Sequence, residues 1–196
     1  IICHASGAMT SDIFSGITEA GAFGYSIHPM YAISSTTKSY REMQKCFFTV
    51  EGAEEWGNKL CRFIRLLGND CVLLSTENKT KYHAAAVFAS NLVNGLYGSA
   101  VSLLEDCGFE EKQAEQALVP LFMGNASHIA EDGPVAGLTG PIERNDTTTV
   151  KKHLNVLDAN EKHIYISVSE AVLALAEQKY SDRDYSEMKK ILSGQE

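Results

Sequence analysis

The chain has 196 residues, 44% of them hydrophobic and 21% charged, a composition that fits a soluble globular protein with one large domain or two small ones. Its formal net charge of −8 argues against nucleic acid and anionic membranes as principal partners, because both are themselves negative. The five cysteines are widely spaced and include no C-x-x-C pair, which argues against a disulfide framework or a thiolate zinc site and favours a reduced, cytoplasmic protein.

The start of the chain has the character of an internal segment. It opens without Met on a short apolar stretch, Ile1 to His4, which is followed by Ala5-Ser6-Gly7. This pattern is typical of one strand in a larger sheet, so we expect a further segment before it. No signal sequence opens the chain, and no apolar run approaches the roughly 20 residues of a membrane span.

The first third of the chain alternates short apolar runs with helical patterns. Strands separated by helices need crossover connections, so this part predicts a mostly parallel sheet of an α/β domain. We predict strands at 1–4, 25–28, 46–52 and 71–74, helices at 10–19 and 53–67, and a polar loop at 34–39.

From about Glu77 onward the pattern is helical throughout. The change of class predicts two domains, residues 1–76 and residues 77–196, and the fold class α/β followed by all-α. We predict helices at 82–106, 110–126 (broken internally by Pro120), 147–160, 161–179 and 186–192.

Two of the predicted strands end in histidine. His4 is followed by Ser6 and Gly7, and His28 ends the second strand. Ligands of open parallel sheets bind beyond the carboxyl ends of the strands, so these groups are candidates for one binding site. Alternatively, each histidine simply bonds a neighbouring carbonyl.

The long predicted helix carries a polar stripe beside an apolar face. At 100° per residue, His83, Ser90, Asn91 and Asn94 fall in one sector. Either this stripe faces a cleft between sheet and helices, or water supplies its partners. Two lysines at the start of the helix, Lys79 and Lys81, add positive charge for a carboxylate or phosphate, unless they are merely solvated.

A turn-rich loop from Gly133 leads into the helix predicted at 147–160. Its prolines and glycines fix the backbone that delivers Arg144 and Asp146. Arg144 is therefore a candidate ligand-binding residue. Asp146 has two interpretations, as a binding residue or as the N-cap of the helix.

Several familiar site patterns are absent from the sequence. No histidine pair has the i, i+4 spacing of a helical metal site, and no G-x-S-x-G elbow is present, so we expect neither a metal site nor a serine hydrolase. A G-x-G-x-x-G fingerprint is missing as well. If a dinucleotide binds, its main fingerprint must lie in the segment that we expect before Ile1.

Six motifs in this order resemble a known bacterial family. They are His4-Ala5-Ser6-Gly7, Ser26-Ile27-His28-Pro29, Phe48-Thr49-Val50-Glu51-Gly52, Lys81-Tyr82-His83-Ala84-Ala85-Ala86, Ser90-Asn91 and Leu138-Thr139-Gly140-Pro141. The family consists of oxidoreductases in which a Rossmann-like domain precedes a helical domain called domain of unknown function 2520.

The resemblance implies an NADP-dependent or NAD-dependent reductase of the 6-phosphogluconate dehydrogenase C-terminal-like superfamily. Ketopantoate reductase and pyrroline-5-carboxylate reductase are relatives of this kind, and such proteins commonly form homodimers through their helical domains. The Lys-x-x-x-Asn pair of ketopantoate reductase is not reproduced, because Ala85 follows Lys81 by four residues.

The expected activity is hydride transfer from the nicotinamide cofactor to a C=O or C=N bond of a small carboxylate substrate, with a ketopantoate-like substrate favoured. A non-catalytic binding or dimerisation module is the alternative. We expect cofactor contacts from His4, Ser6 and Gly7. The expected catalytic residues are His83 or His28 as proton donor, Asn91 and Lys81, and the substrate-binding residues are Arg144, Asp146 and Ser90.

Overall fold

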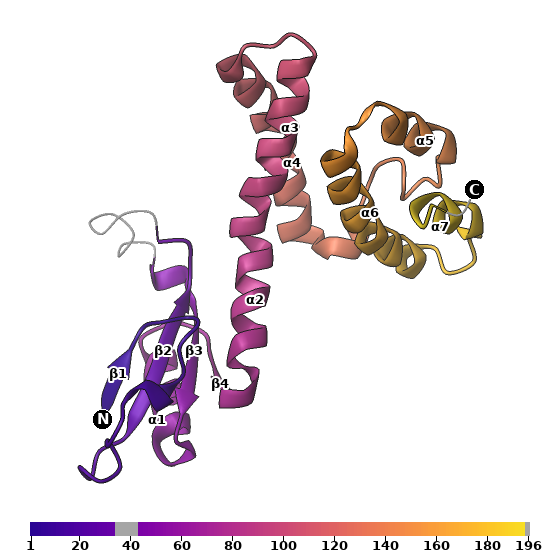
Figure 1. The fold of residues 1–196 in the computed structure, drawn as a ribbon. Helices are drawn as coiled ribbons and strands as arrows, with labels where there is room; N and C mark the ends of the chain where they lie inside the picture. The colour runs from indigo at the N-terminus through magenta and orange to yellow at the C-terminus, as the bar shows by residue number, and fades with distance from the viewer. Residues whose placement is uncertain (34–42, 195–196) are drawn as a thin grey trace. The chain divides into compact units, whose positions relative to one another are not determined.

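The computed structural model describes residues 1–33 and 43–194, so the polar loop predicted at 34–39 lies outside the described residues. The chain divides into two compact units, Ile1–Leu96 and Tyr97–Glu196. A sheet and the first helices form unit one, and helices alone form unit two (Figure 1). The prediction of an α/β fold followed by helices is confirmed.

The sheet of the first unit has four strands in the order β1-β2-β3-β4. Two of its three pairings, β1 with β2 and β3 with β4, are parallel, so the sheet is mostly parallel as predicted. The pairing of β2 with β3 is antiparallel. The strands are β1 (Ile2–His4), β2 (Gly24–Met30), β3 (Phe47–Gly52) and β4 (Cys71–Leu74).

The prediction of a helix at residues 10–19 is wrong. Only a single 3-10 turn, η1 (Ser11–Ile13), forms there. Gly16 and Gly21 both take a positive φ, of 71° and 70°, which a right-handed helix does not accommodate. The segment therefore crosses to β2 as a series of turns.

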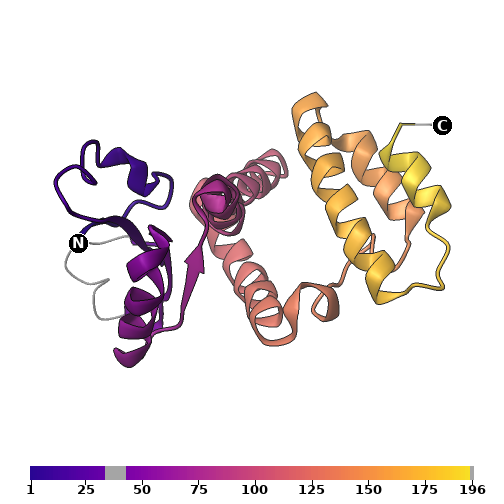
Figure 2. The same cartoon turned by 90° about the horizontal axis from the view of Figure 1, so that it is seen from below.

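One face of the sheet is apolar and packs on α1 (Glu54–Leu66) (Figure 2). Side chains alternate between the two faces of a strand, and every second residue of β2 and β3 points to this side. The Tyr25 ring is fully buried, and its hydroxyl donates to the Ala53 carbonyl at 2.7 Å. The buried residues of this core are Tyr25, Val50, Cys61, Ile64 and Cys71.

All five cysteines are free thiols, as expected, but only three lie in the interior. Cys3 and Cys107 are exposed. Cys61 and Cys71 are neighbours in the core, with 3.1 Å between their sulfur atoms. Burial raises the pKa of Cys71 to about 12, so this thiol stays protonated and packs as a small apolar group.

The single helix predicted at residues 82–106 is two helices, α2 (Lys79–Ala89) and α3 (Asn91–Asp106). A short 3-10 turn, η4 (Thr76–Asn78), precedes α2. Ser90 separates the two helices with a φ of −132° and a ψ of −79°. Its hydroxyl donates to the Ala86 carbonyl at 2.6 Å, a bond that competes with the regular helix ladder.

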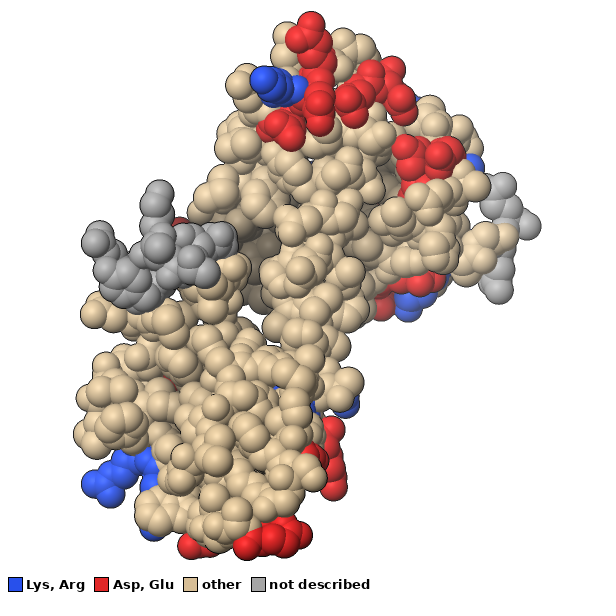
Figure 3. All heavy atoms as spheres, turned by 60° about the vertical axis from the view of Figure 1, so that its left-hand side comes forward, with Lys and Arg blue, Asp and Glu red and all other residues tan. Residues whose placement is uncertain are grey.

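The segment from η4 through α3 has its charged residues only near its two ends. No Lys, Arg, Asp or Glu occurs at positions 82–104. By length and composition alone, Thr76–Asp106 passes as a membrane span, contrary to the expectation that no apolar run approaches that length. The face shown in Figure 3 has a broad uncharged area, and acidic side chains gather where α3 meets α4 (Glu111–Ala136).

The second unit is a helical assembly whose core lies between its last three helices (Figure 2). α4 does not end at residue 126 as predicted, and Pro120 lies inside it; the helical angles are interrupted at Gly133 instead. The other helices are α5 (Thr147–Val156), α6 (Ala159–Lys179) and α7 (Ser186–Leu192). Their buried core residues include Val150, Leu173, Ala176, Tyr185 and Met188.

Candidate functional site

The second face of the sheet is polar, and we call it the polar face. Ser26 and His28 alternate with the apolar residues of β2, and their register partners on β3 are Glu51 and Thr49. Ser26, Thr49 and Glu51 are almost completely buried. Buried polar groups cost free energy unless they are bonded, so their partners decide what this face does.

Lys79, the first residue of α2, is buried on this face with no exposed surface. Its Nζ donates to Ser26 Oγ at 2.7 Å, and Ser26 Oγ donates in turn to the Ser6 carbonyl at 2.9 Å. Burial lowers the pKa of Lys79, and the charge of Glu51 opposes that effect. The lysine thereby connects α2 to the loop that follows β1.

Glu51 is also fully buried, and its carboxylate accepts three hydrogen bonds. One oxygen accepts from the Ser11 amide at 2.9 Å. The other accepts from the hydroxyls of Ser11 at 2.9 Å and Thr76 at 2.7 Å. These bonds compensate much of the cost of burying a carboxylate.

His28 forms a pair with Tyr82 of α2. The distance from His28 Nδ1 to the Tyr82 hydroxyl is 2.6 Å, and the two rings meet edge to face at 86°. Burial lowers the pKa of His28, and the nearby charges of Lys79 and His83 lower it further. The imidazole is therefore neutral near pH 7, and its Nε2 has no hydrogen bond to the residues that the structure describes.

Gly7 lies against both histidines of the site. A Cβ added at Gly7 would come within 2.8 Å of His28 Nε2, closer than real Cβ atoms approach, and within 3.0 Å of His83 Nδ1, which is a tight contact. His83 Nδ1 is buried and has no hydrogen-bond partner among the described residues. A bare backbone thus meets two imidazole nitrogens at one point of the polar face.

The structure thus brings together four of the predicted residues, Ser6, Gly7, His28 and His83, on one face. His4 has a local role, because its Nε2 bonds the Thr10 carbonyl and its Nδ1 accepts from the Ser6 amide, both at 3.1 Å. This is the neighbour-bonded alternative that the sequence left open.

The predicted residues further along the helices are not part of this cluster. Lys81, Ser90 and Asn91 are exposed. The break at Ser90 interrupts the helix, so the predicted polar stripe does not continue in one regular sector. Lys79, which is two residues from Lys81 and therefore about 200° around the helix, occupies the buried position instead.

Three residues of the polar face were missed as site candidates, Ser26, Glu51 and Tyr82, and Lys79 was considered only as a positive charge at the start of the helix. A sequence signal for two of them exists. Ser26 lies in a strand with strict apolar-polar alternation, and so does Glu51. A strand that is buried on both faces yet alternates in this way indicates a polar face covered by protein.

The predicted residues Arg144 and Asp146 belong to the second unit. Asp146 is the N-cap of α5, where its carboxylate accepts from the Thr149 amide at 3.0 Å and the Thr149 hydroxyl at 2.6 Å. These bonds lower the pKa of Asp146. The N-cap interpretation therefore accounts for this carboxylate, and the side chain of Arg144 is exposed.

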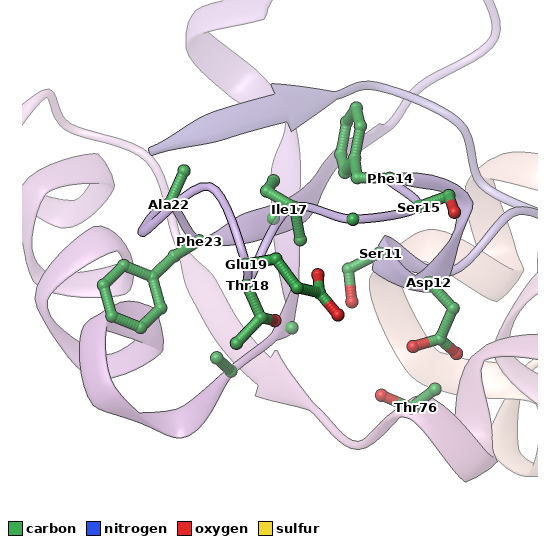
Figure 4. Close-up of a pocket in the computed structure, with 14 residues that line it drawn as sticks. Ser11, Asp12, Phe14, Ser15, Ile17, Thr18, Glu19, Ala22, Phe23 and Thr76 are labelled. Atoms are coloured by element: carbon green, nitrogen blue, oxygen red, sulfur yellow. The ribbon is translucent and has the colours of Figure 1, made fainter.

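A separate cavity of about 520 Å³ opens in the first unit beside η1 (Figure 4). Asp12 and Glu19 lie on its wall with several hydroxyl groups, and none of the predicted site residues lines it. Ser11 and Thr76 line the cavity and also bond Glu51. The Glu51 carboxylate therefore contacts the wall of this cavity from the side of the sheet.

Several solved structures resemble the chain, among them the following two. One is protein TM1727 from Thermotoga maritima, with 24% identity, a TM-score of 0.75, and coverage of 91% of this chain and 70% of that protein. The other is the putative NADP oxidoreductase BF3122 from Bacteroides fragilis, with 22% identity, a TM-score of 0.62, and coverage of 91% and 64%. At these identities the likeness shows the fold.

Comparison with the curated proteins gives no match. Comparison with protein families gives one that covers more than half of the sequence. Residues 46–172, from the strand β3 into α6, match the family described as domain of unknown function, DUF2520. The chain therefore belongs to the DUF2520 family.

Proposed function

We propose that this protein is an NAD(P)-dependent reductase that acts on a C=O or C=N bond of a small carboxylate substrate. The carrying observation is the polar face, where His28 Nε2 and the unpartnered His83 Nδ1 meet the bare backbone of Gly7. The fold supports the proposal, because one protein that shares it is named a putative NADP oxidoreductase.

The residues present fit the reactive end of a nicotinamide cofactor. The close approach at Gly7 leaves no side chain between the backbone and the two imidazoles, and Ser6 precedes it in the same loop. When bound, NADPH or NADH supplies the hydride. Ser6 and Gly7 would hold its reactive end. The sequence contains no G-x-G-x-x-G fingerprint, so we place only the reactive end of the dinucleotide on these residues.

The histidine pair supplies the proton that must accompany the hydride. A neutral His28 carries one ring proton, and the Tyr82 hydroxyl at Nδ1 fixes which nitrogen holds it. With the tyrosine donating to Nδ1, the proton is at Nε2, the atom beside Gly7. His28 donates this proton to the substrate while the Tyr82 hydroxyl proton moves to Nδ1; the resulting tyrosinate then takes a proton from water before the next turnover, a return that burial favours because it raises the pKa of Tyr82.

Two further groups act on charge and orientation. The Lys79 ammonium lies on the same face and stabilises the negative charge that develops on the substrate oxygen or nitrogen. His83 Nδ1 gains a hydrogen-bond partner when substrate binds, which removes the cost of leaving it buried and unbonded. Arg144 remains our proposal for binding the substrate carboxylate, Lys81 is a further candidate for this role, and Asn91 is proposed to orient the carbonyl.

A second copy of the chain is the proposed partner, through the helical domain. Phe88 of α2 and, beyond the break at Ser90, Leu92 and Leu96 of α3 are 70%, 47% and 42% exposed. They lie in the run without charged residues at positions 82–104. An apolar patch of this kind marks an interaction surface, so sedimentation should give a dimer that Phe88→Glu weakens.

The test of the activity is a panel of keto acids and cyclic imines, with NADPH and NADH oxidation followed at fixed pH. A ketopantoate-like keto acid is the expected substrate class, and reduction of imines alone would assign the C=N chemistry. No oxidation with any substrate, by a protein that binds the nucleotide, would contradict the proposal.

The second candidate function is a non-catalytic binding or dimerisation module, favoured by the exposed apolar residues of α2 and α3. It predicts that His83→Ala and Arg144→Ala leave ligand binding and biological function intact. Loss of turnover in folded His83→Ala protein would exclude it.

A further inference from the structure

Glu51 and Lys79 are the two fully buried charged side chains of the polar face, among the residues that the structure describes. They occupy neighbouring positions, because Ser26, which bonds Lys79 Nζ, is the register partner of Glu51. An isolated buried ammonium is unstable and loses its proton, whereas an opposite charge nearby retains it.

We propose that Glu51 is a positioning residue that keeps Lys79 protonated, and so sets the upper pH limit of the reduction. The effect on the reaction rests on the proposed function, since a neutral Lys79 would not stabilise the negative charge that develops on the substrate. The effect of Glu51 on the protonation of Lys79 rests on the geometry of the polar face. Hydrogen bonds from Ser11 and Thr76 hold the carboxylate in place on the strand beside Ser26.

The other groups that face Lys79 do not replace Glu51. Ser26 on β2 is a neutral acceptor, and the Tyr82 ring of α2 lies with its centroid 5.5 Å from Nζ. His28 and His83 are the remaining titratable groups of the face, and protonation of either would add a like charge. Glu51 is thus the group that favours the ammonium, consistent with the direction of its effect on the pKa of Lys79.

The experiment titrates Lys79 directly, by NMR of its Cε in lysine-labelled full-length protein without nucleotide or substrate. In Glu51→Gln, which keeps the size of the side chain, the Lys79 midpoint should fall by about 1–3 pH units. Glu77→Gln is the matched control, because Glu77 is close in sequence but exposed, and it should leave the midpoint in place. An unchanged midpoint in folded Glu51→Gln would overturn the inference.

A double variant keeps the test decisive if Glu51→Gln does not fold. Removing both charges, in Glu51→Gln with Lys79→Met, should restore a cooperative urea transition, because no unpaired buried ammonium remains. If the double variant also fails to fold, the coupling between the two charges is not the reason and the inference is wrong.

Failure of this inference and failure of the proposed function give different results. The NMR titration involves no catalysis, so an unshifted midpoint leaves the reductase proposal standing. Where NADPH oxidation is measurable, the alkaline limb of its pH profile should move down with the Lys79 midpoint in Glu51→Gln and stay in place in Glu77→Gln.

Discussion

The two faces of the sheet are built from alternate residues of the same strands, yet they differ in kind. Tyr25 and Val50 point to the face covered by α1 and belong to an apolar core. Ser26 and Glu51, their neighbours in sequence, point to the other face and are equally buried. Both pairs are buried, but Tyr25 and Val50 pack in an apolar core, whereas Ser26 and Glu51 make hydrogen bonds on a face that also contains Lys79.

The difference teaches where stability and chemistry reside. Burial of apolar surface stabilises the fold in proportion to area, whereas buried polar groups at best recover the cost of losing water. The polar face has recovered much of that cost through the bonds of Glu51 and Lys79, but His83 Nδ1 and Thr49 Oγ1 have no hydrogen-bond partner among the described residues. Changes on the apolar face should therefore lower stability, and changes on the polar face should lower activity.

The largest effect is expected for His28→Gln, which removes the proton donor beside Gly7. The rate of NADPH-dependent reduction should fall by about 10²–10⁴-fold, the range for loss of acid-base catalysis. His153→Gln is the matched control, because His153 forms a similar pair with Tyr165, at 2.9 Å, in the second unit. Equal losses in the two variants would show that the pairing acts through the fold alone.

On the apolar face, Tyr25→Ala should lower the free energy of unfolding by about 3–5 kcal/mol, because it leaves a ring-sized cavity. Tyr25→Phe loses only the hydroxyl bonded to Ala53 and to the Trp56 amide, and should cost about 1 kcal/mol. Urea denaturation measures both. A loss below about 1 kcal/mol for Tyr25→Ala would refute the assignment of this face as a well-packed apolar core.

Gly7→Ala tests the close approach on the polar face. Its Cβ would require His28 to move, so we expect reductase activity to fall by about 10–100-fold, as misplacement of a catalytic group does. Gly98→Ala, in α3, has nothing within 4 Å of the new Cβ and should keep full activity. Comparable kcat/KM values for the wild type and Gly7→Ala would contradict the proposed role of the loop.

A smaller effect is expected in the pH dependence of stability. The pKa of His28 in the folded state is below its usual value of 6.5, so the unfolded chain binds the proton more readily. The contribution of neutral His28 to the free energy of unfolding is therefore complete above about pH 6.5. It is lost as the pH falls through the pKa of His28 in the folded state. His28→Gln should therefore show a shallower loss of stability on acidification; an identical slope would be inconsistent with the lowered pKa.

Much of the fold could be predicted because apolar runs and their periods are local signals. The strand predicted at residues 71–74 is β4, and the change to helices after it is where the sequence placed it. The turns at residues 10–19 could not be predicted from the helical period, because the positive φ of Gly16 overrides it. The break at Ser90 depends on a side-chain bond to Ala86, for which the pattern has no signal.

The site was partly predictable for a similar reason. The sequence singled out Gly7 after the first strand and His28 at the end of the second, and both lie on the polar face, although β2 continues past His28 to Met30. Lys79 was named beside Lys81 as a candidate cation, but the sequence preferred Lys81 as the site residue; the predicted helix began at residue 82, whereas α2 begins at Lys79 itself. Which of the two lysines is buried depends on which side of the helix faces the sheet, and the sequence pattern does not contain this tertiary information.

The most direct test of the polar face as the nucleotide's reaction site is the thermal midpoint of the full-length protein with NADPH, with NADH and with no ligand, for wild type and Gly7→Val. Ligand binding to the native state raises the midpoint. We predict a clear rise with one nucleotide in wild type and a smaller rise in Gly7→Val, because the added side chain occupies the approach to His28 and His83. No rise in wild type, or the same rise in both proteins, would contradict the assignment.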